Sequence, residues 1–213
     1  FVVAEAFRAS RIVAFSTACV YPYVAADSGG ATEDTPTTPP PGDYANSCVG
    51  RERAFEYGSR RWGTPGRLVR LEYAIDMRYG VLYDVASRVF AGAPVDVTMG
   101  HVNVIWQGDA NEACLRLLAH CTAPTSPLNL SGPETVSVRW LAGEFGRRFE
   151  RSPTITGRES PTAWLVDSAA SRALLGAPRI PLERMIDWVA DWVARGQPGL
   201  GKPTHFEARD GKY

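Results

Sequence analysis

Hydroxyl side chains stand at two points where a strand and a helix can bring them together. Ser16 and Thr17 follow the apolar run 12–15, which is continuous, as in strands buried on both faces. Tyr44 opens the stretch 44–62, which is predicted to be a helix. Ligands of open α/β sheets bind beyond the carboxyl ends of the strands, so Thr17 and Tyr44 can face one crevice. There a hydroxyl can hold a substrate oxygen while a tyrosine exchanges its proton. The alternative is that Thr17 only satisfies backbone groups and Tyr44 only packs.

Four features follow one another in a particular order along the first third of the chain. Residues 16–21 read S-T-A-C-V-Y, and an acidic, proline-rich loop, the helix opened by Tyr44 and the apolar strand 67–74 come next. This order resembles the extended short-chain dehydrogenase/reductases, the family of NAD-dependent epimerases and dehydratases, in which S-[ST]-x-x-V-Y ends a strand. The resemblance implies that Thr17 and Ser16 orient the substrate oxygen and that Tyr44 is the catalytic acid and base.

Position 48 departs from the family pattern. The family's lysine stands four residues after the tyrosine, holds the nicotinamide ribose and lowers the pKa of the tyrosine, but this chain has Cys48 there. Bringing a tyrosine from a pKa near 10 to 7 takes roughly 4 kcal/mol of electrostatic help, which a neutral thiol cannot supply. We hypothesise that Arg51, on nearly the same helical face as Tyr44, or the positive ring of the cofactor substitutes in part. The alternative for Arg51 is a solvated surface arginine.

The glycine-rich loop that cradles a pyrophosphate, G-x-G-x-x-G, does not occur in the sequence. In the family this loop lies on the first strand–helix unit, upstream of the features present here. The chain also starts at Phe1, without an initiator methionine. We therefore expect an N-terminally truncated chain that binds NAD or NADP weakly unless another chain supplies this unit.

The resemblance implies further contacts around the same crevice. The expected cofactor contacts are Cys48, Ser16, Tyr73 and Ala74. The expected substrate contacts are Tyr21, Arg78, Asn103, Trp106 and Gln107. Arg78 and Arg88 could meet an anionic substrate group, although exposed arginines usually have no such role. Family members commonly dimerise through the helix of the tyrosine, so a homodimer through parts of 49–62 is expected.

The rest of the pattern predicts an α/β fold. Predicted helices are 81–91, 109–121, 137–149 and 181–195, and predicted strands are 95–97, 102–106 and 127–130. We expect the later strands of a Rossmann-like, doubly wound parallel sheet and a small C-terminal α/β substrate lobe. Residues 1–75 would belong to the cofactor domain, and 76–213 would form the lobe with segments that return to the sheet. The tail 196–213 is predicted to be irregular.

Charge and cysteine usage narrow the function classes. The 23 Lys and Arg residues balance 23 Asp and Glu residues, which predicts no nucleic-acid partner. No apolar run reaches the roughly 18 residues that span a membrane, and no signal peptide is recognisable. The four cysteines form no C-x-x-C pair and no zinc spacing with histidine. We therefore expect reduced thiols, no metal and a cytoplasmic protein.

The sequence thus indicates an NAD(P)-dependent epimerase/dehydratase or oxidoreductase that acts on a hydroxyl-bearing carbon of a sugar, nucleotide sugar or sugar acid. A second hypothesis, motivated by Cys48, is a catalytically impaired NAD(P)-binding regulatory or scaffold protein of the same fold. A third is a fragment that is inert because it is truncated, which would expose an apolar face where the first strands should pack.

Overall fold

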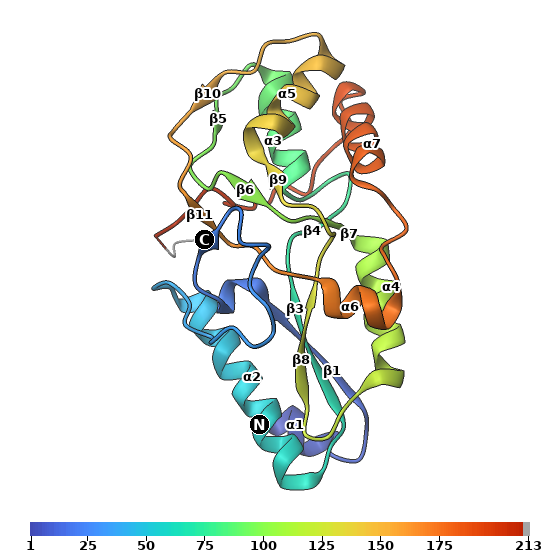
Figure 1. The fold of residues 1–213 in the computed structure, drawn as a ribbon. Coiled ribbons are helices and arrows are strands. Elements are labelled where there is room, and N and C mark those ends of the chain that lie inside the picture. The colour runs from blue at the N-terminus through green and yellow to red at the C-terminus, as the bar shows by residue number, and fades with distance from the viewer. Residues whose placement is uncertain (211–213) are drawn as a thin grey trace.

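The structure, a computed structural model, describes residues 1–210 and contains a sheet region and a helical lobe. In Figure 1 the three long strands and α2 occupy the lower part of the molecule, and α3, α5 and α7 gather at the top. The chain passes between the two regions several times, and residues 105–117, 126–130 and 169–175 return to the sheet. The boundary at residue 75 stays a prediction.

Three parallel strands in the order β1-β3-β8 form the central sheet. They are β1 (Ile12–Thr17), β3 (Gly66–Leu71) and β8 (Ser126–Leu130). The register pairs Thr17 with Leu71 and Leu71 with Leu130, so the three strands end together. Ligands of parallel α/β sheets bind at such an edge.

Helices cover this sheet on both faces. They are α1 (Val2–Ala6), α2 (Asp43–Trp62), α4 (Gln107–Leu117) and α6 (Ala169–Leu175). α2 packs on β1, whereas α4 and α6 cover the face that carries Val69 and Leu128. Leu68 and Val69 are neighbours and both are buried, as expected for a strand covered on both sides. The predicted parallel α/β arrangement is confirmed.

The outer edge of the described sheet is β1, and it borders an apolar groove. The groove has a volume of about 520 Å³ and lies between β1 and α4. Phe7, Phe15, Leu115 and Leu118 line it and are exposed. The apolar face that the third sequence hypothesis requires is therefore present at this edge.

α2 begins at Asp43, one residue earlier than predicted. Its N-cap residue is Gly42, and Asp43 lies in the first turn, where negative charge is favourable. Arg60 and Arg61 stand in the last turn, and Gly63 ends the helix in the left-handed conformation with φ of 71°. Tyr44 therefore lies in the first turn, at the end of α2 that is nearest to the carboxyl ends of the strands.

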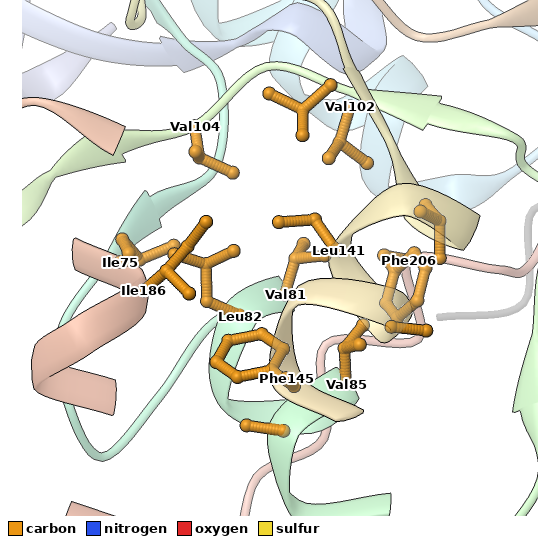
Figure 2. Close-up of a cluster of buried hydrophobic side chains, with 14 of the residues drawn as sticks. Ile75, Val81, Leu82, Val85, Val102, Val104, Leu141, Phe145, Ile186 and Phe206 are labelled. Atoms are coloured by element: carbon orange, nitrogen blue, oxygen red, sulfur yellow. The ribbon is translucent and has the colours of Figure 1, made fainter. Parts of the chain in front are cut away.

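The lobe has its own apolar core between α3 (Val81–Ala91), α5 (Val138–Phe149) and α7 (Leu182–Ala194). Figure 2 shows Leu82 of α3, Phe145 of α5 and Ile186 of α7 converging in this core. Phe206 of the C-terminal tail is also buried in it. The three helices predicted at these places are confirmed to within one residue at each end.

Three elements differ from the prediction. The strand predicted at 67–74 ends at Leu71, and β4 (Ala74–Ile75) is a separate short strand. α4 begins at Gln107 rather than at residue 109 and passes into a 3₁₀ turn after Leu117. The strand predicted at 102–106 is interrupted, because the Asn103 side chain bonds the Glu134 carbonyl (2.9 Å) and the Val166 N–H (2.8 Å).

Short elements complete the chain. They are β2 (Val24–Ala25), β4 (Ala74–Ile75), β5 (Val95–Asp96), β6 (His101–Val102), β7 (Ile105–Trp106), β9 (Val136–Ser137), β10 (Ile155–Thr156), β11 (Thr162–Ala163) and the 3₁₀ turns η1 (Ala18–Val20) and η2 (Leu118–His120). Residues 196–210 form no helix or strand, as predicted, and 211–213 lie outside the described part. Across residues 1–210, every helix is too short or too polar to cross a lipid bilayer.

Candidate functional site

A pocket of about 550 Å³ lies where the carboxyl ends of β1 and β3 face the lobe. The sheet region contributes Ser16, Thr17, Cys19, Leu71, Glu72, Tyr73, Ala74 and, from α2, Tyr44. The lobe contributes Tyr79, Gly80, Gln107 and Trp164, and the tail contributes Pro203, Thr204 and His205. The sequence could not indicate the tail residues, because no local pattern marks them as neighbours of a strand end.

Thr17 and Tyr44 meet in this pocket, as the order of the motifs predicts. Their side chains are hydrogen-bonded, and the Thr17 Oγ1 also accepts a bond of 3.2 Å from the Cys19 N–H. Tyr44 is 46% exposed, so its ring can reach a ligand. Burial of part of the phenol raises the pKa of Tyr44, and the neighbouring Cys48 and Cys19 raise it further, while the bond from Thr17 lowers it. The phenol is therefore neutral near pH 7.

Cys48 lies one turn beyond Tyr44 and is fully buried, in contact with that phenol. The hypothesis that Arg51 replaces the lysine is not supported. The Arg51 Nη1 donates instead to the carbonyl of Phe15 on β1, at 2.9 Å, and Arg51 is absent from the causes that shift the pKa of Tyr44. The Arg51 guanidinium is therefore engaged with β1.

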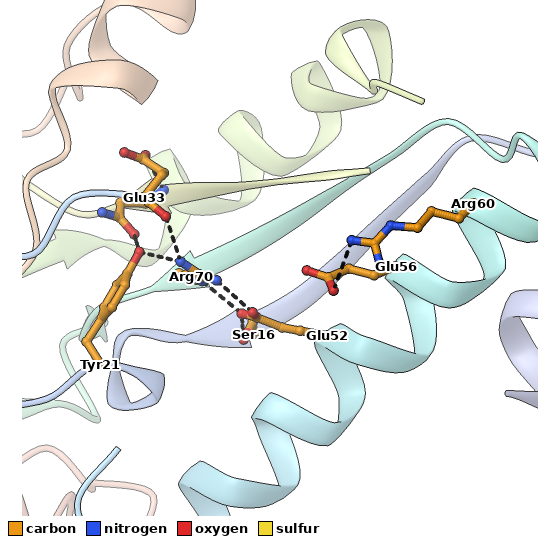
Figure 3. Close-up of polar contacts among 8 residues, drawn as sticks. Ser16, Tyr21, Glu33, Glu52, Glu56, Arg60 and Arg70 are labelled. Carbon is orange, nitrogen blue, oxygen red and sulfur yellow. Dashed lines mark hydrogen bonds and ion pairs between the residues drawn. The ribbon is translucent and has the colours of Figure 1, made fainter. Parts of the chain in front are cut away.

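Ser16 and Tyr21 belong to a buried polar network next to the pocket (Figure 3). The Ser16 hydroxyl donates to Glu52 (2.6 Å), and Arg70 donates to both oxygens of Glu52 (2.9 and 2.8 Å). Arg70 also donates to the Tyr21 hydroxyl (2.7 Å), which in turn donates to Asn129 (2.8 Å). Tyr21 is 1% exposed and is not among the residues that line the pocket, so its contact with substrate stays a prediction that the geometry does not support. The hydroxyl of Ser16 is committed to Glu52, although Ser16 borders the pocket.

This network fixes the polar interior of the sheet. Burial by itself would lower the pKa of Arg70, but the hydrogen bonds and charge of Glu52 raise it above its usual value. Asn129 bonds the Ala31 carbonyl (2.8 Å), and its N–H donates to Glu33 (2.8 Å), which holds the proline-rich loop to β8. The proximity of Glu52 to the site could have been inferred from the sequence, because Glu52 stands eight residues after Tyr44, about two helical turns along the same face of α2.

Glu72 also lines the pocket, one residue beyond the end of β3, and the sequence analysis did not single it out as a site residue. It is 2% exposed, and burial raises its pKa well above the usual range. Cys19 beside it has a pKa raised to about 12, first by burial and then by the charge of Glu72. Both groups therefore stay protonated when no partner approaches.

The other predicted contacts divide into two groups. Tyr73, Ala74 and Gln107 line the pocket, as expected of cofactor and substrate contacts. Asn103 and Trp106 are not among its lining residues, so their contacts with substrate stay predictions that the geometry does not support. The Asn103 side chain is hydrogen-bonded to the backbone of Glu134 and Val166. The Trp106 ring packs edge-on against the Trp188 ring, with the ring centroids 5.1 Å apart.

The two candidate arginines are paired away from the pocket. Arg78 forms an ion pair with Asp76 (2.8 Å), and Arg88 forms one with Glu207 of the tail (3.0 Å). Neither is among the residues that line the pocket, so the contact of Arg78 with substrate stays a prediction that the geometry does not support.

The C-terminal tail is anchored where it borders the pocket. The Thr204 N–H (2.8 Å) and hydroxyl (2.6 Å) both donate to Asp84 of α3. The Arg209 guanidinium donates to Thr162 and lies 3.9 Å from the centroid of the Tyr23 ring. Because these bonds hold the tail on both sides of His205, residues 203–205 form a fixed wall of the pocket.

The pocket lining is poor in positive charge. No arginine or lysine occurs among the described residues that line it, and His205 is the one basic side chain among them. Residues 1–210 contain no cluster of three or more His, Cys, Asp or Glu suited to hold a metal ion. The hydroxyl and amide groups fit a hydroxyl-rich ligand without negative charge, such as a sugar or the nicotinamide riboside end of a dinucleotide. They do not fit its pyrophosphate, for which the chain has no glycine-rich cradle.

The fold of this chain resembles that of known proteins, whereas its sequence does not. The sequence matches no family model and no curated protein. The fold matches UDP-glucose 4-epimerase from Thermus thermophilus in complex with NAD, with a TM-score of 0.74 and 19% identity over 89% of this chain and 66% of that chain. It matches UDP-glucose 4-epimerase from Thermotoga maritima with UDP-glucose, with a TM-score of 0.74 and 16% identity over 92% and 68%. For UDP-glucuronic acid 4-epimerase from Bacillus cereus with NAD the TM-score is 0.77, with 15% identity over 91% and 65%.

The chain therefore has the Rossmann-like α/β fold of NAD-dependent UDP-sugar epimerases. It spans about two thirds of the length of these structures. All four cysteines are free thiols in the structure. At these identities the likeness concerns the fold, and the activity must be argued from the pocket.

Proposed function

We propose that this chain is the catalytic part of an NAD(P)-dependent epimerase, dehydratase or oxidoreductase that acts on a hydroxyl-bearing carbon of a nucleotide sugar or related sugar. The observation that carries the proposal is the hydrogen-bonded pair Thr17 and Tyr44 in a 550 Å³ pocket at the carboxyl ends of parallel strands. The shared fold of UDP-sugar epimerases supports it.

The chemistry follows from the positions of these two groups. Thr17 would hold the reacting oxygen of the substrate, and Tyr44 would exchange the proton of that oxygen. NAD or NADP, when bound, would supply the hydride transfer at the same carbon. Cys48, Tyr73 and Ala74 are the residues that we expect beside its nicotinamide end. Because the pKa of Tyr44 is raised, we expect the rate to keep rising with pH up to and beyond the ordinary tyrosine range.

A pyrophosphate site must come from outside the features described here. We infer that a further strand–helix unit with a glycine-rich loop pairs with β1, supplied either upstream on the same polypeptide or by another chain. The apolar groove beside β1, with Phe7 and Phe15 exposed, supports this inference, since parallel strands are normally covered.

The test combines cofactor binding with turnover. NAD binding is measured by calorimetry for residues 1–213 and for a chain extended upstream, and both are assayed with UDP-glucose and UDP-glucuronic acid. We expect strong binding only with the extension, and turnover that Tyr44→Phe abolishes. Turnover that survives Tyr44→Phe, or an extended chain that does not bind NAD, would refute the proposal.

A regulatory or scaffold protein of the same fold is the second candidate. Cys48 and the raised pKa of Tyr44 favour it, because neither helps to form a phenolate. A chain that binds NAD but never changes its absorbance with any sugar would support this candidate.

We also propose a cytoplasmic homodimer. The exposed side of α2, which includes Tyr57 and Arg61, is the proposed contact surface. The free cysteines agree with a reducing compartment. Light scattering after gel filtration tests the dimer, and Tyr57→Glu should dissociate it.

A further inference from the structure

Glu72 is a buried acid for which the proposed reaction has no use. Its N–H donates to the Leu130 carbonyl (3.0 Å), which fixes the backbone at the end of β3. Glu72 is one of the residues that line the pocket, and it is 2% exposed. Within residues 1–210, no side chain or backbone group is hydrogen-bonded to its carboxyl group or forms an ion pair with it.

Among residues 1–210, no lysine or arginine lines the pocket beside Glu72. Cys19 lies beside it on η1, and Tyr44 of α2 and His205 of the tail line the same pocket. Arg70, two residues earlier on β3, already donates to both oxygens of Glu52. A charged carboxylate that is buried without a partner is strongly unfavourable, so Glu72 takes up a proton.

A neutral carboxylic acid in such a place has one strong O–H donor. An apolar site that keeps a carboxyl protonated, so that it can donate a hydrogen bond, is a known catalytic device. Thr17, Tyr44 and Gln107, which also line the pocket, carry uncharged polar groups. The pocket therefore suits a ligand that offers neutral oxygen acceptors.

We propose that Glu72, in its neutral form, donates a hydrogen bond to an uncharged hydroxyl or carbonyl oxygen of the sugar-type ligand and so contributes to substrate specificity. This inference rests on the proposed function and deepens it, because it names the ligand atom that this residue recognises. Glu72 is a binding residue here and takes no part in the proton exchange at Tyr44.

The experiment measures binding of UDP-glucose rather than turnover, by calorimetry between pH 5 and pH 9. The proteins are the wild-type chain, Glu72→Gln, Glu72→Leu and the control Glu183→Gln, which changes an exposed glutamate on α7. Wild-type affinity should be constant at low pH and should fall about tenfold per pH unit once Glu72 ionises. Glu72→Gln, which keeps a neutral donor, should bind at every pH within a few fold of the affinity that wild type shows at low pH, and should therefore bind more tightly than wild type at high pH. Glu72→Leu should lose roughly tenfold.

Three binding results would contradict the proposed role of Glu72, and a fourth result would separate it from the proposed function. Equal affinity of wild type and Glu72→Leu, or no binding of UDP-glucose by wild type at any pH, overturns the inference. Affinity that rises with pH and is lost in Glu72→Gln also overturns it, because that pattern belongs to a carboxylate that binds a cation. Binding with the expected pH dependence but without turnover would refute the proposed function and leave the role of Glu72 intact.

Discussion

Glu52 and Glu72 are equally buried, at 3% and 2% exposed, yet they are in opposite chemical situations. Glu52 lies in the polar network inside the sheet region, with Arg70 on both oxygens and the Ser16 hydroxyl on one. Glu72 lies at the pocket with no such partner among residues 1–210, and burial raises its pKa. Burial alone therefore does not set the charge of a carboxyl group; the partners that the fold brings to it do.

The same contrast separates the hydroxyl groups. Ser16 and Tyr21 have their hydroxyls bound within the network, whereas Thr17 and Tyr44 have theirs in the pocket. Neighbouring residues of one motif thus serve the interior and the site separately. Four predictions test this contrast.

The largest effect is expected from removing the partner of Glu52. Arg70→Met leaves a buried carboxylate unpaired, so the free energy of unfolding should fall by about 3–5 kcal/mol. Urea denaturation at pH 7 measures it. The control Arg60→Met removes an arginine that is 69% exposed and should change little. A loss below about 1 kcal/mol for Arg70→Met would mean that the pair does not hold the interior.

Next in size is the separation of the hydroxyl groups. In the active enzyme, Tyr44→Phe should lower kcat by about 10²–10⁴-fold with little change in stability. Ser16→Ala should do the reverse, lowering the free energy of unfolding by about 1–3 kcal/mol while kcat changes little. Steady-state kinetics and urea denaturation of both variants test this. If Ser16→Ala lowered kcat as much as Tyr44→Phe does, the division between network and pocket would be wrong.

A smaller effect concerns the pH dependence of stability. Because the folded state raises the pKa of Glu72 above its unfolded value, this group favours folding below the unfolded pKa. Its contribution is lost as pH rises from the unfolded pKa through the folded one. Glu72→Gln cannot ionise, so its stability relative to wild type should increase over that window, by about 1–3 kcal/mol at the alkaline end. Thermal melts from pH 4 to pH 9 measure it, and parallel curves for the two proteins would contradict the prediction.

The smallest effect is expected at Asp84, an intermediate case. Burial raises the pKa of Asp84, while the two bonds from Thr204 lower it. Thr204→Val removes the hydroxyl bond alone and should reduce stability by about 0.5–1.5 kcal/mol. It should also loosen the tail, so that limited proteolysis cuts the region 200–210 sooner than in wild type. Unchanged cleavage would show that Phe206 and Arg209 hold the tail without Thr204.

Much of the architecture could be predicted from local patterns. The apolar runs of β1 and β3, the periodicity of α3, α5 and α7, and the order of Thr17 and Tyr44 all follow from strand and helix spacing. The predicted boundaries of the elements were less accurate, because α4 begins two residues early and the predicted strand 102–106 is interrupted at Asn103. That break depends on bonds to residues 134 and 166, which no local pattern contains.

By itself, the sequence determined the α/β class, the hydroxyl–tyrosine pair, the cysteine at position 48 and the absence of a glycine-rich loop, since residue type and spacing fix these. Tertiary structure alone decided which polar groups face the pocket. In the folded chain Tyr21 is hydrogen-bonded within the network, and Arg78 and Arg88 form ion pairs outside the pocket. Glu72 has no partner among residues 1–210, and residues 203–205 lie against the strand ends. The physical reason is that the charge and accessibility of a side chain depend on neighbours far along the chain, and only the packed fold brings those neighbours together.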